Sequence, residues 1–257
     1  MTPSPKIAAV LLATLACAAA AVYSIHAQSQ SQPAPQPVSS LNHNLVLLDA
    51  AHGGPDSGAT LGDNVPEKFN TLALAGRMRA ALAAAGFTVV MTREADSSDP
   101  LTPDQRAAIA NRTRAVACII LHATNTGSGV HIYTSALAPT DPLDDPFEDF
   151  VPVPWESAQA PSVRQSLRLA NDLKSALATD NLPAAIGKAP IRPLDNMMCP
   201  AVAIEIAPLA VSGSEATPVT DADYQKRVTR LLTKAIVTWR THAEPANPAA
   251  TTRKATP

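Results

Sequence analysis

The hydrophobic and polar positions from residue 45 to residue 243 alternate between short apolar runs and longer segments of helical period. The runs are predicted strands, at residues 45–48, 88–92, 118–121, 130–134 and 202–206. The periodic segments predict helices at about 64–85, from 103 onward, at 162–178 and at 221–241. The second helix has a defined start, because Thr102, Pro103 and Gln105 match a capping box with proline in the first turn. This alternation predicts a three-layer α/β/α sandwich with a mixed or mostly parallel central sheet.

Residues 1–28 have the pattern of an export signal. A short cationic start that includes Lys6 precedes an apolar run over residues 7–25. The Ile25-x-Ala27 pattern suits cleavage, whereas the length of the run also suits an uncleaved anchor. We therefore expect an exported protein, periplasmic or extracellular, with anchoring in the inner membrane as the alternative.

The rest of the chain divides into a linker, one domain and a tail. Residues 29–44 and 244–257 have too little apolar surface to offset the entropy of ordering, so we expect them to be disordered. The domain between them, residues 45–243, is large enough for one hydrophobic core. Within it, residues 136–161 form an acidic, Pro-rich insertion with three aromatic residues. A solvated loop and a lid over the active site are both consistent with that composition.

Charge and cysteine content narrow the functional classes. The chain has 20 Lys and Arg against 22 Asp and Glu, a formal net charge of -2, which leaves no cationic excess for a nucleic-acid partner. Cys17 lies inside the apolar run of the signal and is not placed for lipid attachment. Cys118 and Cys199 lie in apolar surroundings, where they would pack as thiols or, in an exported protein, form a disulfide.

Two histidines stand at the carboxyl ends of predicted strands, where sheets of this class place their functional sites. His52 follows the first strand and His122 follows the third. The glycines at 53 and 54 allow the backbone to turn sharply after His52. Two converging imidazoles suit a divalent transition metal, most commonly zinc.

An open catalytic zinc site needs a third protein ligand, and Glu67 is the first candidate. Asn64-x-x-Glu67 is also the spacing of a capping box, in which the carboxylate would only satisfy the start of a helix. Asp56 and Asp63 are alternative carboxylates in the same loop. The spacing does not decide among them.

Glu205 interrupts the apolar segment 201–207, which otherwise has the character of a buried strand. A buried carboxylate is costly unless a cation or a hydrogen-bond partner compensates it. A position beside a metal would compensate it and would suit a general base toward a metal-bound water. The alternative is a glutamate at a strand end with its carboxylate in solvent.

Five segments, taken in order and at their spacing, resemble one known family. They are residues 48–59, Glu67-Lys68, Thr92-Arg93-x-x-Asp96, Leu121-His122-Ala123 and residues 200–206. Together they resemble the zinc-dependent N-acetylmuramoyl-L-alanine amidases, cell-wall amidase family 3. The resemblance implies that His52, Glu67 and His122 bind zinc and that Glu205 is the catalytic carboxylate. It also implies peptidoglycan or muropeptides as substrate, with hydrolysis of the amide between N-acetylmuramic acid and L-alanine.

The chain departs from the family pattern around these residues. It has Ala50-Ala51 in place of Pro-Gly, Leu121 and Thr124 in place of Ile and Asn around His122, and Ala207-Pro208 in place of Gly-Phe. Two alternatives therefore stay open: a weak or inactive homologue that binds the cell wall, and a zinc hydrolase that acts on another amide.

The resemblance also bears on partners and on substrate contacts. Some relatives carry, at the place of the 136–161 insertion, a segment that blocks the site until an activator protein displaces it, so we expect an activator here by analogy. Arg93 and Arg192 could meet carboxylates of the stem peptide or could form surface or helix-end salt bridges.

Overall fold

A six-stranded sheet forms the centre of the part of the chain that the computed structural model describes, residues 41–140, 154–210, 213 and 215–242. Its order is β2-β1-β3-β6-β4-β5, and only β4 and β6 pair antiparallel. The sheet is therefore mixed. The strands are β1 (Asn42–Ala50), β2 (Thr88–Met91), β3 (Ala115–Ala123), β4 (Val130–Ser135), β5 (Ala184–Ala189) and β6 (Ala201–Ile206).

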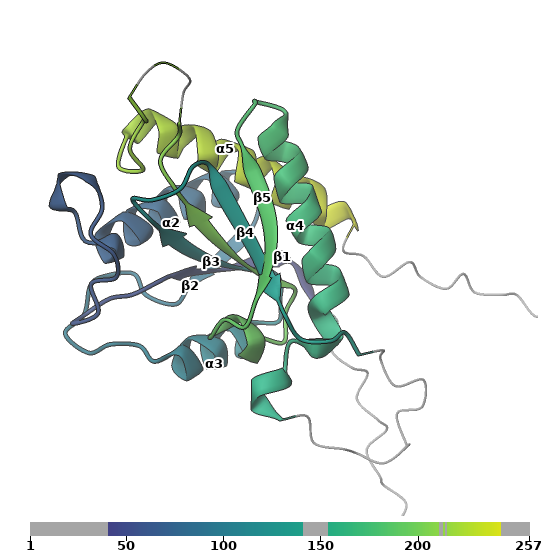
Figure 1. Ribbon diagram of the computed structural model, residues 1–257. Helices are drawn as coiled ribbons and strands as arrows, with labels where there is room; N and C mark the ends of the chain where they lie inside the picture. The colour runs from purple at the N-terminus through teal and green to yellow at the C-terminus, as the bar shows by residue number, and fades with distance from the viewer. Residues whose placement is uncertain (1–40, 141–153, 211–212, 214, 243–257) are drawn as a thin grey trace, which may run out of the picture. The chain divides into compact units, whose positions relative to one another are not determined.

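Helices cover both faces of the sheet, which confirms the predicted three-layer sandwich (Figure 1). Alternate residues of β1 show the two layers: Val46 and Leu48 pack with the larger helical layer, and Leu47 packs toward the other face. The larger layer consists of α2 (Glu67–Ala84), α4 (Val163–Ala178) and α5 (Ala222–His242). The other consists of α3 (Pro103–Thr113) and the short 3-10 helix η4 (Leu194–Asn196).

Most predicted helices and strands agree with the structure. The main differences are the start of α2 and the strand β5. The capping box of Thr102 and Gln105 starts α3 as expected. Helix α2 begins at Glu67, later than predicted, because residues 62–64 form a 3-10 turn and Pro66 precedes the helix. Strand β5 was not predicted, because this edge strand is only partly buried and contains Gly187 and Lys188 in place of an apolar run.

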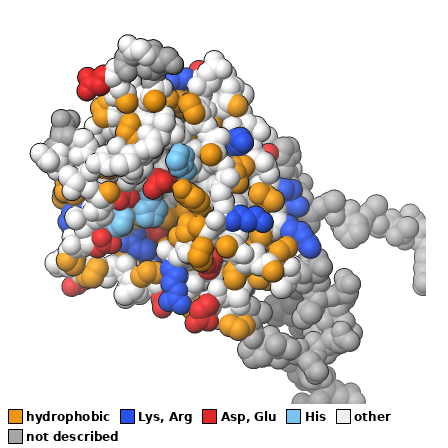
Figure 2. All heavy atoms as spheres, viewed as in Figure 1, with side chains coloured by type: hydrophobic (Ala, Val, Ile, Leu, Met, Phe, Trp, Pro, Cys, Tyr) orange, Lys and Arg blue, Asp and Glu red, His pale blue; other side chains and the backbone are white. Residues whose placement is uncertain are grey.

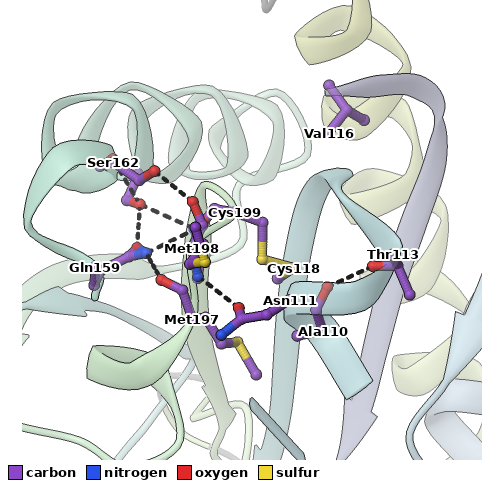
Figure 3. The surroundings of a disulfide bond; sticks show 12 residues. Ala110, Asn111, Thr113, Val116, Cys118, Gln159, Ser162, Met197, Met198 and Cys199 are labelled. Atoms are coloured by element: carbon purple, nitrogen blue, oxygen red, sulfur yellow. Dashed lines mark hydrogen bonds between the residues drawn. A yellow bond between two sulfur atoms is a disulfide. The ribbon is translucent and has the colours of Figure 1, made fainter. Parts of the chain in front are cut away.

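Cys118 and Cys199 form a disulfide (Figure 3). It joins β3 to the segment just before β6, across 81 residues of sequence. Hydrogen bonds hold the same segment from both sides: the Gln159 amide donates to the Cys199 carbonyl at 2.9 Å, and the Met198 N–H donates to Asn111 Oδ1 at 2.7 Å (Figure 3). The sequence had left the pairing open, and the structure places both sulfurs in one bond.

The chain position of the 136–161 insertion, after the strand at 130–134, predicts that it leaves the sheet next to the strand of His122, and the direction of β4 corrects this expectation. Strand β4 lies beside β6, not beside β3, and it runs from Val130, paired with Ile206, past Tyr133, paired with Ala203. The insertion therefore leaves the sheet at the end opposite to His122. Residues 141–153 lie outside the described part of the chain, and so do residues 1–40 and 243–257, which include the predicted signal and tail. Residues 42–44, predicted to belong to the disordered linker 29–44, instead begin β1. None of the described helices combines the length and the apolar character that a membrane span requires.

Candidate active site

The structure brings His52, Glu67 and His122 together at the carboxyl ends of β1 and β3 and the start of α2. One ligand atom from each residue lies within 4.8 Å of the others. His52 Nε2 is 3.1 Å from Glu67 Oε2, and His122 Nδ1 is 2.9 Å from Glu67 Oε1. Figure 2 shows histidine side chains reaching the surface of this face, with acidic and basic side chains beside them.

Local backbone geometry allows this close approach. His52 adopts a left-handed backbone with φ of 63°, a conformation that costs energy in a residue other than glycine. Gly58 passes so close to the cluster that a Cβ there would lie 2.6 Å from both His52 Cδ2 and Glu67 Oε2. A glycine is therefore required at position 58 for the two ligands to meet.

Glu67 is a buried carboxylate held by hydrogen bonds, and it does not act as a capping residue. Pro66 precedes α2 without a side-chain cap, and the Glu67 side chain turns toward the two histidines. The backbone N–H groups of Ala59 and Ala123 donate to its two oxygens at 2.9 and 3.0 Å. Burial alone would raise the pKa of Glu67, but hydrogen bonds from His122 and His52 outweigh it and hold the pKa well below its usual range. The carboxylate stays charged.

Asp56 contacts His52 from the side away from Glu67. His52 Nδ1 is 2.9 Å from Asp56 Oδ2, so an Nδ1–H that donates to Asp56 leaves Nε2 free to face the centre of the cluster. The hydrogen bond with Glu67 raises the pKa of His52; burial opposes this effect, and Asp56 adds to it. Asp56 therefore orients the His52 ring and is not itself within the cluster. The side chain of Asp63 lies outside the described part.

Asp56→Ala is expected to weaken zinc binding by about tenfold to a hundredfold, because outer hydrogen-bond partners fix the orientation of a histidine ligand. Competition with a chelator of known affinity measures the change. Asp223→Ala is the matched control, since Asp223 is an exposed aspartate of α5 that pairs with Lys226. Equal zinc affinities of the two variants would contradict the orienting role.

The geometry of the cluster fits a tetrahedral metal. Zinc binds nitrogen and oxygen ligands at about 2.0–2.2 Å, which places neighbouring ligand atoms about 3.3 Å apart. The contacts of Glu67 with the two imidazoles, at 3.1 and 2.9 Å, are close to that spacing. Two neutral imidazoles and one charged carboxylate can hold a divalent ion and leave a fourth position for water or substrate.

Glu205 lies on β6 beside His122, its register partner on β3. Its side chain is 35% exposed, so it is less buried than the apolar strand around it suggests. His131 on β4 faces it from the other side, with Nδ1 3.7 Å from Glu205 Oε2. Burial and then Glu205 raise the pKa of Tyr133, the next residue along β4 on the same face. The sequence analysis did not single out His131 and Tyr133. Their alternation with Val130 and Ile132 in a predicted strand was the signal that would have placed both on one face.

A buried arginine that sequence reasoning missed holds the loop that carries His52. Arg106 on α3 forms a 2.6 Å ion pair with Asp49 and donates to the carbonyls of Ala50 and His52 at 2.8 and 2.6 Å. A lone arginine in a helix gives no sequence signal for such a contact, because its partner lies 57 residues away.

A model of the Amidase_3 family, described as N-acetylmuramoyl-L-alanine amidase, matches residues 46–238. This chain belongs to that family. Among curated proteins, the germination-specific N-acetylmuramoyl-L-alanine amidase of Bacillus subtilis (strain 168) is 46% identical over 57 residues, which span 22% of this chain and 24% of that relative.

Solved amidase structures share the fold. The amidase Ami1 from Mycobacterium smegmatis matches with a TM-score of 0.58 and 20% identity, over 79% of this chain and 100% of that one. The CwlD amidase from Clostridioides difficile, solved in complex with the GerS lipoprotein, matches with a TM-score of 0.51 and 19% identity, over 77% and 99%. At these identities the likeness shows a common architecture for this member of the amidase family.

Proposed function

We propose that this amidase-family chain is a zinc-dependent enzyme that hydrolyses the amide between N-acetylmuramic acid and L-alanine in peptidoglycan. The observation that carries the proposal is the convergence of His52, Glu67 and His122, with the carboxylate of Glu205 on the neighbouring strand. Family membership supports the reaction class. The donor set supports zinc.

The residues of the chain have distinct roles in the proposed reaction. When bound by His52, Glu67 and His122, zinc polarises the amide carbonyl and lowers the pKa of water toward neutrality. Glu205 accepts the proton that water loses as its oxygen bonds to the carbonyl carbon. Glu205 then delivers this proton to the alanine nitrogen, so that the carbon–nitrogen bond breaks and a free amine leaves.

Neighbouring side chains keep these groups in place. Asp56 and Arg106 hold His52 through its ring and its carbonyl oxygen. His131 and Tyr133 flank Glu205 on β4 and limit the directions in which its carboxylate can move. The reacting groups therefore come from the carboxyl ends of three adjacent strands, β1, β3 and β6, and from the first residue of α2, and these elements fix their separation.

Product analysis of purified muropeptides tests this function. The zinc-loaded protein is expected to release a sugar without peptide and a stem peptide that begins with L-alanine, both identified by mass spectrometry. Cleavage at another bond would favour the alternative of a different amide substrate. Intact muropeptides after prolonged incubation would favour the alternative of an inactive cell-wall-binding homologue.

Export is part of the proposal, in the periplasm or outside the cell, with residues 1–28 either cleaved or retained as an inner-membrane anchor. The Cys118–Cys199 disulfide supports it, because structural disulfides persist mainly in oxidising compartments. In intact host cells, both cysteines are expected to resist alkylation until a reductant is added, which peptide mass spectrometry measures. Alkylation of both thiols without reductant would contradict export.

A protein activator is the last element of the proposal. The Clostridioides difficile relative is held in a complex with a lipoprotein, and the family resemblance implies an activator that acts on the 136–161 insertion. The described carboxyl-terminal flank of the insertion contacts the start of α3, where Trp155 Nε1 donates to Asp104 Oδ1 at 3.1 Å. We propose this side of the molecule as the surface that an activator would meet.

A further inference from the structure

A small cavity adjoins the proposed zinc ligands, on the face of the sheet that α3 covers. Its volume is about 130 Å³, and His52, His122, Arg106 and Arg192 contribute to its walls. The acidic residues of its wall already have cationic or imidazole partners: Asp49 pairs with Arg106, and Asp56 pairs with His52. Any positive charge that can bind a ligand in this cavity therefore comes from the arginines around it.

Arg106 and Arg93 use their donors to hold the protein backbone. Arg106 donates to the Leu101 carbonyl as well as to Asp49, Ala50 and His52, so all its nitrogens are engaged. Arg93 donates through Nε to the Ala50 carbonyl at 2.9 Å and through Nη2 to the Lys68 carbonyl at 2.6 Å. Its Nη1 is buried and has no hydrogen-bond partner among the described residues. Arg106 therefore has no free donor nitrogen, and Arg93 is not among the residues that line this cavity.

Arg192 differs from these two arginines. Its side chain is 53% exposed, and within the described part of the chain its charged partner is Glu156, at 3.9 Å. Glu156 is itself 66% exposed, and ion pairs between exposed groups of this kind contribute little. A planar guanidinium with free donors suits bidentate binding of a carboxylate.

We propose that Arg192 binds a carboxylate of the stem peptide and makes the enzyme selective for stems that carry it. This inference rests on the proposed function, which places the leaving alanine nitrogen at the zinc cluster. The next residue of the stem is a D-glutamate, which is joined to the following residue through its side-chain carboxyl. Its α-carboxylate therefore stays free and is the first anionic group beyond the scissile amide. The cavity that His122 and Arg192 share is sized for a small group of this kind.

Equilibrium binding to the zinc-loaded full chain tests the proposal without requiring turnover. The two probes are L-alanyl-D-glutamate and L-alanyl-D-isoglutamine, which differ only in an α-carboxylate or an α-amide on the second residue. By titration calorimetry, the wild type is expected to bind the carboxylate form about tenfold more tightly, as for a charge-assisted hydrogen bond in a half-exposed site. Arg192→Gln is expected to abolish this preference while leaving the affinity for the amide form unchanged.

Two further variants control the experiment. Arg230→Gln should keep the full preference, because Arg230 is an exposed arginine of α5 that pairs with Asp180. Glu156→Gln should bind the carboxylate form at least as tightly as the wild type, since it removes the competing carboxylate from Arg192. A wild type without the preference, or an Arg192→Gln variant that loses affinity equally for both probes, overturns the proposal. A retained preference in a protein that cleaves no muropeptide would refute the proposed function alone.

Discussion

Glu205→Gln is expected to lower the rate of muropeptide hydrolysis by on the order of a hundredfold or more while the protein retains its zinc. Glutamine has nearly the shape of glutamate, but its amide cannot accept the proton that water loses or return it to the leaving nitrogen. The contact with His131 is 3.7 Å long, and both side chains are about one-third exposed, so its loss should affect folding little. Steady-state kinetics and elemental analysis of the same sample measure both properties.

Glu94→Gln is the matched control for Glu205→Gln. Glu94 is an exposed glutamate that pairs with Arg79 at 3.2 Å and is not one of the residues of the His52–Glu67–His122 cluster, so its replacement should leave the rate unchanged. A rate near that of the wild type in Glu205→Gln would assign proton transfer to another group. Loss of zinc from that variant would show that Glu205 supports the metal and would leave its role as a base without support.

His122→Ala is expected to remove both zinc and activity. The imidazole of His122 is one of three donors, and its removal leaves Glu67 with one fewer partner than its buried carboxylate has in the intact cluster. Two remaining protein ligands do not complete a catalytic zinc site. Elemental analysis after dialysis against a weak chelator measures zinc per chain, and circular dichroism verifies that the variant is folded.

His43→Ala serves as its control, because His43 lies near the start of β1, at the other end of the strand from the cluster. That variant should retain one zinc per chain and full activity. Full zinc occupancy with unchanged affinity in His122→Ala would remove His122 from the ligand set.

The elements that the sequence predicted are those with strong local signals. A capping box gives the start of α3, and long apolar runs give β3 and β6. The histidines at the ends of β1 and β3 were predicted to converge because parallel strands end at the same edge of the sheet. The convergence of Glu67 with them needed either the structure or a family resemblance, since its spacing equally suited a helix cap.

Other features depend on tertiary contacts that have no local signal. The antiparallel direction of β4 is set by its pairing with β6, and it places the start of the insertion at the far end of the sheet. The sequence could not distinguish Arg93 from Arg192, because only the fold shows which of them is tied to backbone carbonyls. Arg106 was missed for the same reason.

Hydrolysis of a muropeptide in water enriched in ¹⁸O tests the central claim most directly. If the zinc cluster and Glu205 direct water onto the amide between N-acetylmuramic acid and L-alanine, mass spectrometry will find one ¹⁸O in the lactyl carboxylate of the sugar product and none in the released stem peptide. Label in a carboxylate of the peptide, with the lactyl group still attached to alanine, would contradict the account, because it would place the attack of water at a different bond.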